Sequence, residues 1–308
     1  MERGNHNINN IENNDITQIL NIIKSACRTI SYVIKMSNNI SLSKSKNKTN
    51  VSGDVINKID DIANEILIYE LKHCPLIKNI ASEEEKYIIS TNYNNGKYLV
   101  CFDPLDGSSN IDINITTGTI FTIFKYDNDR DDKINDGNNI VASGYSLYSG
   151  STQLIICDNN KVSQYQLIDY TFQLINDNIK IPIKGNFYSI NDSLSEKWTD
   201  KRYTTLINEF KEDCYSTRWV GSLVADAHRT LIKGGFFAYP ENTSNKEGKI
   251  RLLYEAYPFA HIFKIAGGKS SNGLIDNVLN IPFPKNIHQK TTIILSSPEE
   301  YNKFINTN

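Results

Sequence analysis

The sequence is poor in cysteine, and its cysteines do not form pairs. The 308 residues include only five, dispersed as Cys27, Cys74, Cys101, Cys157 and Cys214, with no Cys-x-x-Cys motif. An odd number of scattered cysteines in mostly apolar surroundings argues against a disulfide framework. We therefore expect reduced, buried thiols in a cytoplasmic protein.

Long apolar runs and an excess of one charge are also missing. No apolar stretch approaches the ~18 residues of a membrane-spanning helix. Residues 1–6 lack the apolar core of a secretory signal. The formal net charge of −2 gives no indication of a nucleic-acid or membrane partner. A chain of this length, 39% hydrophobic, can form two modest domains or one large α/β unit.

The sequence also lacks two common catalytic patterns. Its five histidines show no metal-ligand spacing, and we interpret His228 and His261 as packed or surface side chains in predicted helices. No Gly-x-Ser-x-Gly motif marks a nucleophilic serine. These absences leave the acidic side chains as the main candidates for chemistry.

Two carboxylates stand directly before a Gly-Ser-Ser turn in residues 103–110, Asp-Pro-Leu-Asp-Gly-Ser-Ser-Asn. The apolar residues 98–102 predict a buried strand, so Asp103 and Asp106 emerge where a strand ends. Carboxylate oxygens bind hard divalent cations such as Mg²⁺. The backbone N–H groups of residues 107–109 can bind an anion. A cation site beside an anion site is what metal-assisted phosphate ester hydrolysis requires.

Further acids lie at other predicted element ends. Glu83 and Glu84 follow an expected strand at 77–81. Taken alone, such adjacent acids are more often a solvated turn. Beside the two aspartates they could complete a two-metal cluster, in which cations offset the repulsion. Asp60 and Glu255 are additional candidates, but sequence spacing alone does not place them in this cluster.

The apolar spacing predicts two helices near the N-terminus. Residues 16–34 follow i, i+3, i+4, i+7 spacing, which indicates an amphipathic helix capped by Asp15 after a loose polar segment. A second helix is expected at about 55–72, and it places Asp60 on one face. The polar residues 37–49 predict a loop between them.

The rest of the chain alternates strands and helices. Strands expected to form a mixed sheet lie at about 98–102, 119–126, 140–148, 152–157 and 162–166. The second half is expected to contain a helix at 222–233 ended by Gly234-Gly235, a strand at 235–239, a strand that ends at Glu255, and a helix from Pro258 to Gly267-Gly268. We place a boundary near 181–185, between an N-terminal domain over 1–180 and a C-terminal domain over 181–308.

These motifs together resemble the class I fructose-1,6-bisphosphatases, a family of lithium-sensitive, Mg²⁺-dependent sugar phosphatases. The resemblance runs from about Ile16 almost to the C-terminus. Two blocks are highly specific: Val-Gly-Ser-Leu-Val-Ala-Asp-Ala-His-Arg-Thr at 220–230 and Lys-Ile-Arg-Leu-Leu-Tyr-Glu at 249–255. The resemblance implies an α/β fold, a layered α/β/α/β/α sandwich of two tightly packed subdomains.

The resemblance also implies which residues form the site. The ligands of two or three Mg²⁺ ions, which Mn²⁺ can replace, would be Glu83, Glu84, Asp103, the carbonyl of Leu105, Asp106 and Glu255. Asp60 and Glu84 would activate the attacking water. The groups that bind the sugar and its phosphates would be Gly107, Ser108, Ser109, Asn191, Arg218, Tyr239, Lys249 and Arg251.

The implied reaction is hydrolysis of the 1-phosphate of fructose 1,6-bisphosphate to fructose 6-phosphate and phosphate, a gluconeogenic step. The chain has Trp219 and Leu194 where the family pattern has tyrosines. Leucine cannot donate a hydrogen bond, and a charge-assisted one is worth ~1.5–3 kcal/mol. We therefore expect weaker binding of the distal phosphate. The alternatives are a sedoheptulose-1,7-bisphosphatase or dual-specificity enzyme, an inositol monophosphatase, and a catalytically dead regulatory relative.

Two further expectations concern regulation and assembly. The residues that resemble the family's AMP site are Asp15, Ile16, Thr17, Lys97 and Tyr98. Asn13 stands in place of a threonine and Lys125 in place of an arginine. Lysine cannot make the bidentate phosphate contact of arginine, so we expect weak AMP inhibition. The arginine matched by Arg218 reaches across from a neighbouring subunit, which implies a homo-oligomer, a dimer or a homotetramer.

Overall fold

The computed structural model describes residues 2–36, 58–127 and 133–307. The chain begins with two helices, α1 (Glu2–Met36) and α2 (Lys58–Lys72). The predicted helices are present, but α1 already begins at Glu2, so the expectation of a loose N-terminus and an Asp15 cap is wrong. No proline interrupts the segment, and a formed helix propagates at little cost per residue. The predicted 37–49 loop and residues 55–57 lie outside the described residues.

The first half builds a mixed eight-stranded sheet in the order β2-β1-β3-β4-β5-β6-β7-β8. Only β1 and β3 pair in parallel. The strands are β1 (Ile77–Ser82), β2 (Ile89–Ser90), β3 (Tyr98–Asp106), β4 (Thr117–Lys125), β5 (Ile140–Tyr148), β6 (Thr152–Asp158), β7 (Val162–Ile168) and β8 (Thr171–Asn176). Every strand predicted for this half is present, with β2 and β8 added at the edges.

The second half builds a five-stranded sheet in the order β10-β9-β11-β15-β13, and a two-stranded ribbon of β12 and β14. The strands are β9 (Phe187–Ser189), β10 (Ser216–Thr217), β11 (Phe236–Tyr239), β12 (Ile250–Arg251), β13 (Lys269–Ser271), β14 (Lys290–Thr291) and β15 (Ile293–Ser296). The helices are α3 (Lys201–Glu212), α4 (Leu223–Lys233), α5 (Tyr257–Ala266) and α6 (Pro298–Asn306). Shorter helical turns are η1 (Ser108–Ile113), η3 (Gly137–Asn139), η4 (Asp192–Lys197), η5 (Leu252–Ala256) and η6 (Val278–Asn280).

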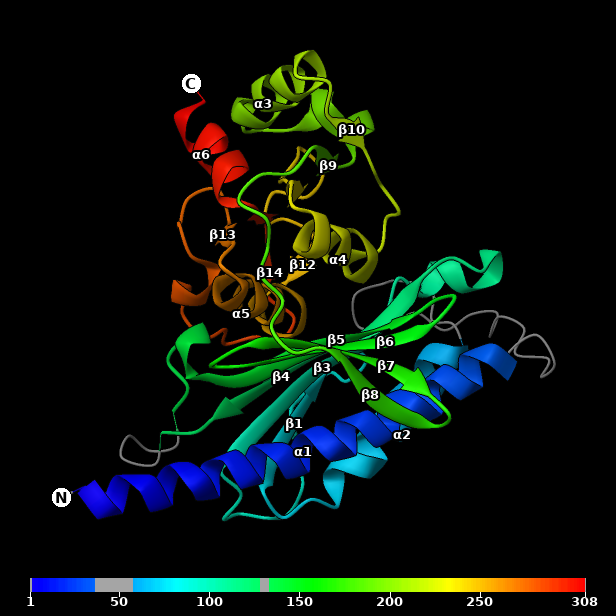
Figure 1. Cartoon of the computed structure of the whole chain (residues 1–308), viewed down its shortest axis with the longest axis vertical. Helices are drawn as coiled ribbons and strands as arrows, with labels where there is room; N and C mark the ends of the chain where they lie inside the picture. The colour runs from blue at the N-terminus through cyan, green and yellow to red at the C-terminus, as the bar shows by residue number, and fades with distance from the viewer. Residues whose placement is uncertain (1, 37–57, 128–132, 308) are drawn as a thin grey trace.

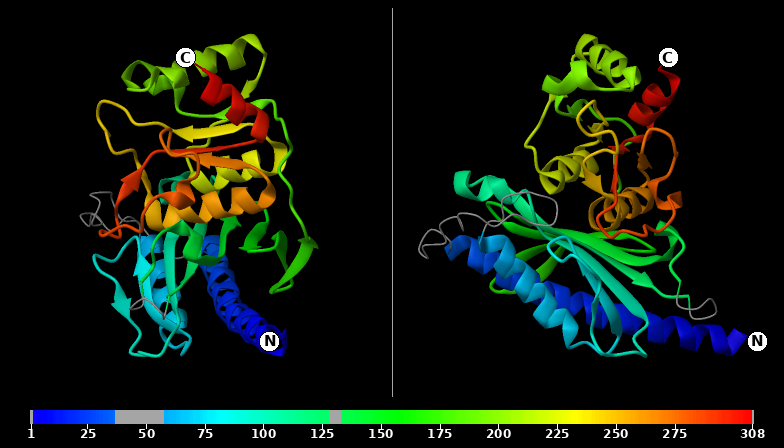
Figure 2. Two further views of the ribbon diagram at one scale, coloured as in Figure 1. Left: turned by 90° about the vertical axis from the view of Figure 1, so that its left-hand side faces the viewer. Right: turned by 180° about the vertical axis from the view of Figure 1, so that it is seen from behind.

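These elements stack in five layers (Figures 1 and 2). Helices α1 and α2 cover one face of the eight-stranded sheet, α4 and α5 lie between the two sheets, and α3 and α6 cover the outer face of the five-stranded sheet. The expected α/β/α/β/α sandwich is confirmed. Strand β3 is buried along its whole length, because alternate side chains enter the two helical layers on either side. This explains why residues 98–102 are a continuous apolar run.

The predicted strand that ends at Glu255 is wrong. Strand β12 ends at Arg251, and Glu255 lies in η5, a single π-helical turn that leads into α5. The Glu255 carboxylate accepts a hydrogen bond from the Arg251 backbone N–H and so closes this turn. All five residues of η5 are buried, and a short buried apolar run does not distinguish strand from helix.

The predicted helix signals of the second half are confirmed. Ser222 is the N-cap of α4, and Gly234 follows the helix with a φ of 76°. Pro258 lies in the first turn of α5, and Gly267 ends that helix in the left-handed region with a φ of 91°. Within the described residues no helix combines the length and apolarity needed to cross a bilayer.

The histidines and cysteines are mostly packed, as predicted. His228 hydrogen bonds with the Tyr145 hydroxyl at 2.8 Å. His261 hydrogen bonds with the Ser143 hydroxyl at 2.8 Å and with Asn159 at 3.0 Å. Four cysteine thiols are buried and free, and Cys214 is exposed. These two imidazoles therefore connect α4 and α5 to the eight-stranded sheet.

We predict that His261 makes folding sensitive to acid. Burial lowers the pKa of His261 from 6.5 to about 4, so the unfolded chain binds more protons between these values. Stability therefore rises with pH in this window and is lost as the pH falls toward 4. Urea unfolding followed by circular dichroism should show that His261→Gln reduces the loss of unfolding free energy between pH 7 and pH 4.5 by about 2 kcal/mol. The exposed His73, changed to Gln, should leave that loss unaltered, and an equal effect of both variants would contradict the prediction.

Candidate active site

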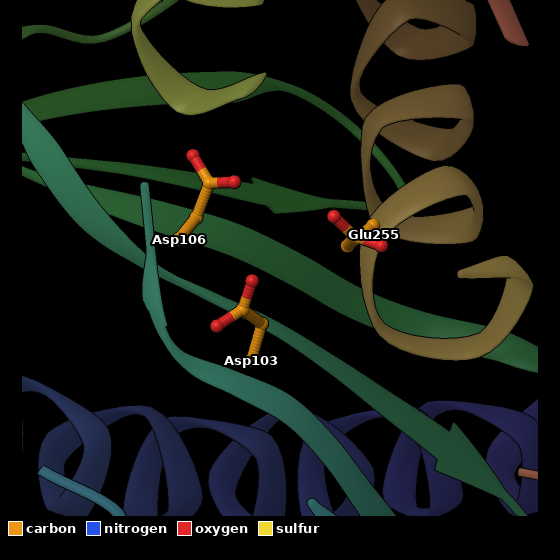
Figure 3. A group of neighbouring side chains, drawn as sticks. All are labelled: Asp103, Asp106 and Glu255. Atoms are coloured by element: carbon orange, nitrogen blue, oxygen red, sulfur yellow. The ribbon is translucent and has the colours of Figure 1, made fainter. Parts of the chain in front are cut away.

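Three carboxylates from two distant parts of the chain meet at the end of β3. One oxygen each of Asp103, Asp106 and Glu255 lies within 4.8 Å of the others. Figure 3 shows Asp103 and Asp106 rising from the same strand and Glu255 approaching from the turn before α5. Their exposed fractions are only 3%, 9% and 7%. The structure therefore brings together three of the predicted metal ligands.

A bulge in β3 places both aspartates on one side of the sheet. Side chains three residues apart in a regular strand point to opposite faces. Here Asp103 pairs with Ile120 and Asp106 with Gly118, so β3 carries one extra residue between these pairs. Such a bulge redirects the following side chain. The Leu105 N–H donates to Asp103 Oδ1 at 2.9 Å and holds the bulged turn.

The cluster is strongly acidic and short of compensating charge. Burial, and then repulsion from Glu83 and the other acids, raises the pKa of Asp103 well above its usual value. Burial is also the main reason that the pKa of Asp106 rises to about 6 and that of Glu255 to about 8. Carboxylates packed in this way are the donor set that hard divalent cations prefer. The residues present therefore fit a divalent cation site.

The remaining predicted acids border the cluster. The backbone N–H of Glu83 donates to the Phe102 carbonyl at 3.1 Å, which ties the turn after β1 to β3. Glu83 Oε1 lies 3.6 Å from Arg251 Nη2. Its charge raises the pKa values of all three clustered carboxylates, so it lies close to them. Glu84 follows in the same turn, where its backbone N–H donates to Ser82 Oγ at 3.3 Å.

Helix α2 places Asp60 beside this turn. Asn64 accepts a hydrogen bond from Ser82 Oγ at 2.7 Å and donates one to Glu85 Oε1 at 3.0 Å. Asp60 precedes Asn64 by four residues and is buried like it, so both side chains share one face of the helix. The face of α2 that carries Asp60 is therefore the one that contacts the turn holding Glu83 and Glu84.

The turn predicted to bind an anion packs closely on the Ser222 side chain at the start of α4. Gly107 has a φ of 72° and precedes η1, which starts at Ser108. A Cβ atom at Gly107 would lie 2.8 Å from Ser222 Cβ, so only glycine fits there. Ser222 Oγ and the Val224 N–H donate to Asp106 Oδ2 at 2.8 and 2.9 Å. The start of α4 thus supports both the predicted anion-binding turn and the carboxylate cluster.

Asp226 is a supporting residue that sequence reasoning missed. It is fully buried on α4 and accepts hydrogen bonds from the backbone N–H groups of Val220, at 3.0 Å, and Gly221, at 2.9 Å. Arg229 Nη1 donates to the same carboxylate at 3.1 Å. Asp226 therefore fixes the loop that leads from Arg218 to Ser222. The acid in the first turn of the predicted helix was the available signal.

A pocket of about 400 Å³ lies next to the cluster. Its walls include four residues predicted to bind the substrate, namely Asn191, Tyr239, Lys249 and Arg251. Leu194 also lines it, and the Trp219 ring packs on Tyr239 with centroids 5.1 Å apart. Both positions that depart from the family pattern are therefore at or beside this pocket. Lys290 lines it too, and sequence reasoning missed this residue.

Arg218 lies away from its own pocket. It is exposed, and its Nη1 donates to the Thr217 carbonyl at 2.7 Å. The guanidinium lies over the Phe187 ring, 5.7 Å from its centroid. Arg218 is not among the residues that line the 400 Å³ pocket. The structure of this single chain therefore does not bring Arg218 to Asn191 and Tyr239.

The residues predicted to bind AMP meet between α1 and β3. Lys97 Nζ lies 3.7 Å from Asp15 Oδ2, and the Tyr98 hydroxyl donates to the same oxygen at 3.5 Å. Lys125 pairs across the sheet with Tyr98. Ile16 is buried, and Thr17 is exposed on α1. The Asp15 carboxylate thus already contacts the two groups expected to hold a phosphate.

Comparison with known proteins decides the family. The profile of the fructose-1-6-bisphosphatase N-terminal domain matches residues 1–176, and that of the C-terminal domain matches residues 181–307. The chain belongs to the class I fructose-1,6-bisphosphatase family. Membership makes it a phosphatase and implies dependence on a divalent metal.

Relatives of this fructose-1,6-bisphosphatase family match almost the whole chain. A fructose-1,6-bisphosphatase class 1 from Persephonella marina is 39% identical over 287 residues, covering 92% of this chain and 89% of the relative. Fructose-1,6-bisphosphatase 1 from Bos taurus is 39% identical over 303 residues, covering 94% and 89%. The crystal structure of Leishmania major fructose-1,6-bisphosphatase in holo form has a TM-score of 0.89, 32% identity and coverage of 94% and 93%.

We predict that Asp103→Asn stabilises the metal-free protein and abolishes its response to metal. The amide keeps the shape and the contact with the Leu105 N–H but removes one of the buried repelling charges. Relief of about 1 kcal/mol would raise the melting temperature by ~1–2 °C in a chain of 308 residues. Differential scanning fluorimetry should show this gain in EDTA and a loss of the upward shift that Mg²⁺ gives the wild type. A variant that melts lower in EDTA, or that keeps the Mg²⁺ shift, would contradict the prediction.

Proposed function

We propose that the chain hydrolyses the 1-phosphate of fructose 1,6-bisphosphate to give fructose 6-phosphate and phosphate, as a gluconeogenic enzyme. One observation carries the proposal: the buried carboxylate cluster adjoins a basic pocket, and Arg251 lies at the boundary between them. Its guanidinium lies 3.6 Å from Glu83, and its side chain lines the pocket with Lys249. A substrate with phosphates at two ends suits this arrangement.

We propose that two or three Mg²⁺ ions bind per subunit and that Mn²⁺ can replace them. The carboxylates that would hold them are those of Glu83, Glu84, Asp103, Asp106 and Glu255, with the carbonyl of Leu105. Bound Mg²⁺ supplies positive charge that stabilises the phosphate oxygens and the leaving oxygen during in-line displacement.

The chain's own residues position the reactants. Asp60 and Glu84 accept a proton from the water that attacks the phosphorus atom. The N–H groups of residues 107–109 and the Arg251 guanidinium hold the 1-phosphate. Lys249 contacts oxygens of the sugar. Asn191 and Tyr239, with an Arg218 from a neighbouring subunit, hold the distal phosphate. The close packing of Gly107 on Ser222 and the location of Arg251 support these roles.

We also propose an assembly and a domain division. Arg218 is exposed and lies outside its own pocket, which supports a homo-oligomer, a dimer or a homotetramer, in which it serves a neighbouring subunit. The eight-stranded sheet ends at Asn176 and the five-stranded sheet starts at Phe187, which supports domains over 1–180 and 181–308. The four buried free thiols are consistent with a cytoplasmic location.

The activity test is a phosphate-release assay with fructose 1,6-bisphosphate and Mg²⁺. Asp106→Ala should lower kcat by about 100-fold or more, because it removes a metal ligand and the acceptor for Ser222. Asp61→Ala, which removes a carboxylate from the next position after Asp60, is the matched control and should retain activity.

Two outcomes of this assay would overturn the proposal. Wild-type activity that persists in EDTA, or in Asp106→Ala, would reject the metal cluster as the catalytic centre. A kcat/KM for sedoheptulose 1,7-bisphosphate about tenfold above that for the fructose substrate would reject the substrate assignment, since tenfold corresponds to ~1.4 kcal/mol of transition-state binding.

We propose that AMP inhibits only weakly. The Asp15 carboxylate contacts Lys97 and Tyr98, so an AMP phosphate would have to displace it or face its charge. Lys125 offers one point charge where an arginine would offer two donors. Inhibition curves with AMP should give a half-inhibitory concentration above the micromolar range, lowered by Lys125→Arg. Micromolar inhibition of the wild type would contradict this proposal.

A further inference from the structure

A basic stripe runs along one face of the β12–β14 ribbon. Arg251 on β12 pairs directly with Lys290 on β14 in an antiparallel register. Side chains of directly paired residues lie on the same face, with Cβ atoms ~4.5–5.5 Å apart. Lys249 precedes Arg251 by two residues and therefore shares that face. Three cationic side chains thus project from two adjacent short segments.

All three cations line the 400 Å³ pocket, whose described walls contain no acidic side chain. Like charges placed directly opposite in a ladder destabilise it. The Arg251 charge is partly met by Glu83, 3.6 Å away, and Lys249 Nζ lies 6.0 Å from the centroid of the Tyr239 ring. Within the described part of the chain, Lys290 has no acidic group at ion-pair distance. The pocket therefore carries more positive charge than the described acids offset.

The neutral groups of the pocket also suit an anion. Asn191, Asn245 and the Tyr239 hydroxyl are hydrogen-bond donors in its walls. Lys290 additionally borders a neighbouring hollow of about 720 Å³, which neither Arg251 nor any clustered carboxylate lines. Lys290 therefore occupies the side of the pocket away from the metal cluster.

From this arrangement we infer that Lys290 is a specificity-determining residue that binds the phosphate remote from the carboxylate cluster. It favours sugar bisphosphates over sugar phosphates that lack this second group. The inference deepens the proposed function, and its substrate class rests on that proposal.

The test compares two substrates that share the cleaved phosphate. Fructose 1,6-bisphosphate carries the remote phosphate, and fructose 1-phosphate lacks it. Lys290→Met keeps the length of the side chain and removes its charge. It should raise KM for the bisphosphate about tenfold more than KM for fructose 1-phosphate, the size expected for one charge-assisted hydrogen bond. Lys290→Arg should restore most of the difference.

Lys246 provides a matched control. It is an exposed lysine that lines the neighbouring hollow but not the pocket. Lys246→Met removes the same charge from the same region and should leave the ratio of the two KM values unchanged. An equal change in the ratio for both variants would show a general electrostatic effect and overturn the inference.

Binding of fructose 6-phosphate gives a readout that does not require catalysis. Calorimetry with Mg²⁺ present should show about tenfold weaker binding to Lys290→Met than to the wild type. If the wild type binds fructose 6-phosphate in this way but hydrolyses no bisphosphate, the proposed function fails and the inference stands. If the wild type hydrolyses the bisphosphate and Lys290→Met alters neither the KM ratio nor the binding, the inference alone fails. If the wild type binds no fructose 6-phosphate, the inference is also overturned.

Discussion

The mutual repulsion of buried carboxylates at the end of β3 is the constraint around which the structure is arranged. Asp103, Asp106 and Glu255 would avoid one another in water, yet packing from two helical layers forces their oxygens to within 4.8 Å. The bulge in β3 and the π-helical turn η5 place these groups inside the molecule. The free energy of the folded core therefore maintains an arrangement that a divalent cation then stabilises.

Arg251 and its neighbours in the sequence connect the pocket to the carboxylate cluster. Arg251 contacts Glu83 on one side and lines the 400 Å³ pocket on the other. Its backbone N–H also closes the turn that carries Glu255. One short segment thus sets the position of a proposed metal ligand and of a proposed phosphate-binding cation together.

Local sequence signals predicted the elements well where one physical effect dominates. The period of residues 16–34 follows from packing against one face of a sheet, and the continuous apolar run of β3 follows from its burial between two helical layers. Sequence could not predict the strand bulge, because it depends on the register in which β3 pairs with β4. It could not predict the fate of Glu255, because a short buried apolar run does not distinguish strand from helix. It also missed Lys290, whose role appears only when β14 pairs with β12. The boundary of α1 failed for a simpler reason, since polar composition was taken as a sign of a loop.

The loop between Arg218 and Ser222 has a consequence for the assembled enzyme. At one end Ser222 touches Asp106, and Asp226 clamps the middle through two backbone N–H groups. At the other end lies the exposed Arg218, which we propose binds substrate in an adjacent subunit. If this loop moves as a rigid unit, ligand binding beside Asp106 in one subunit would change how tightly Arg218 holds substrate in the adjacent subunit. Cooperativity between protomers would then need no motion of whole domains.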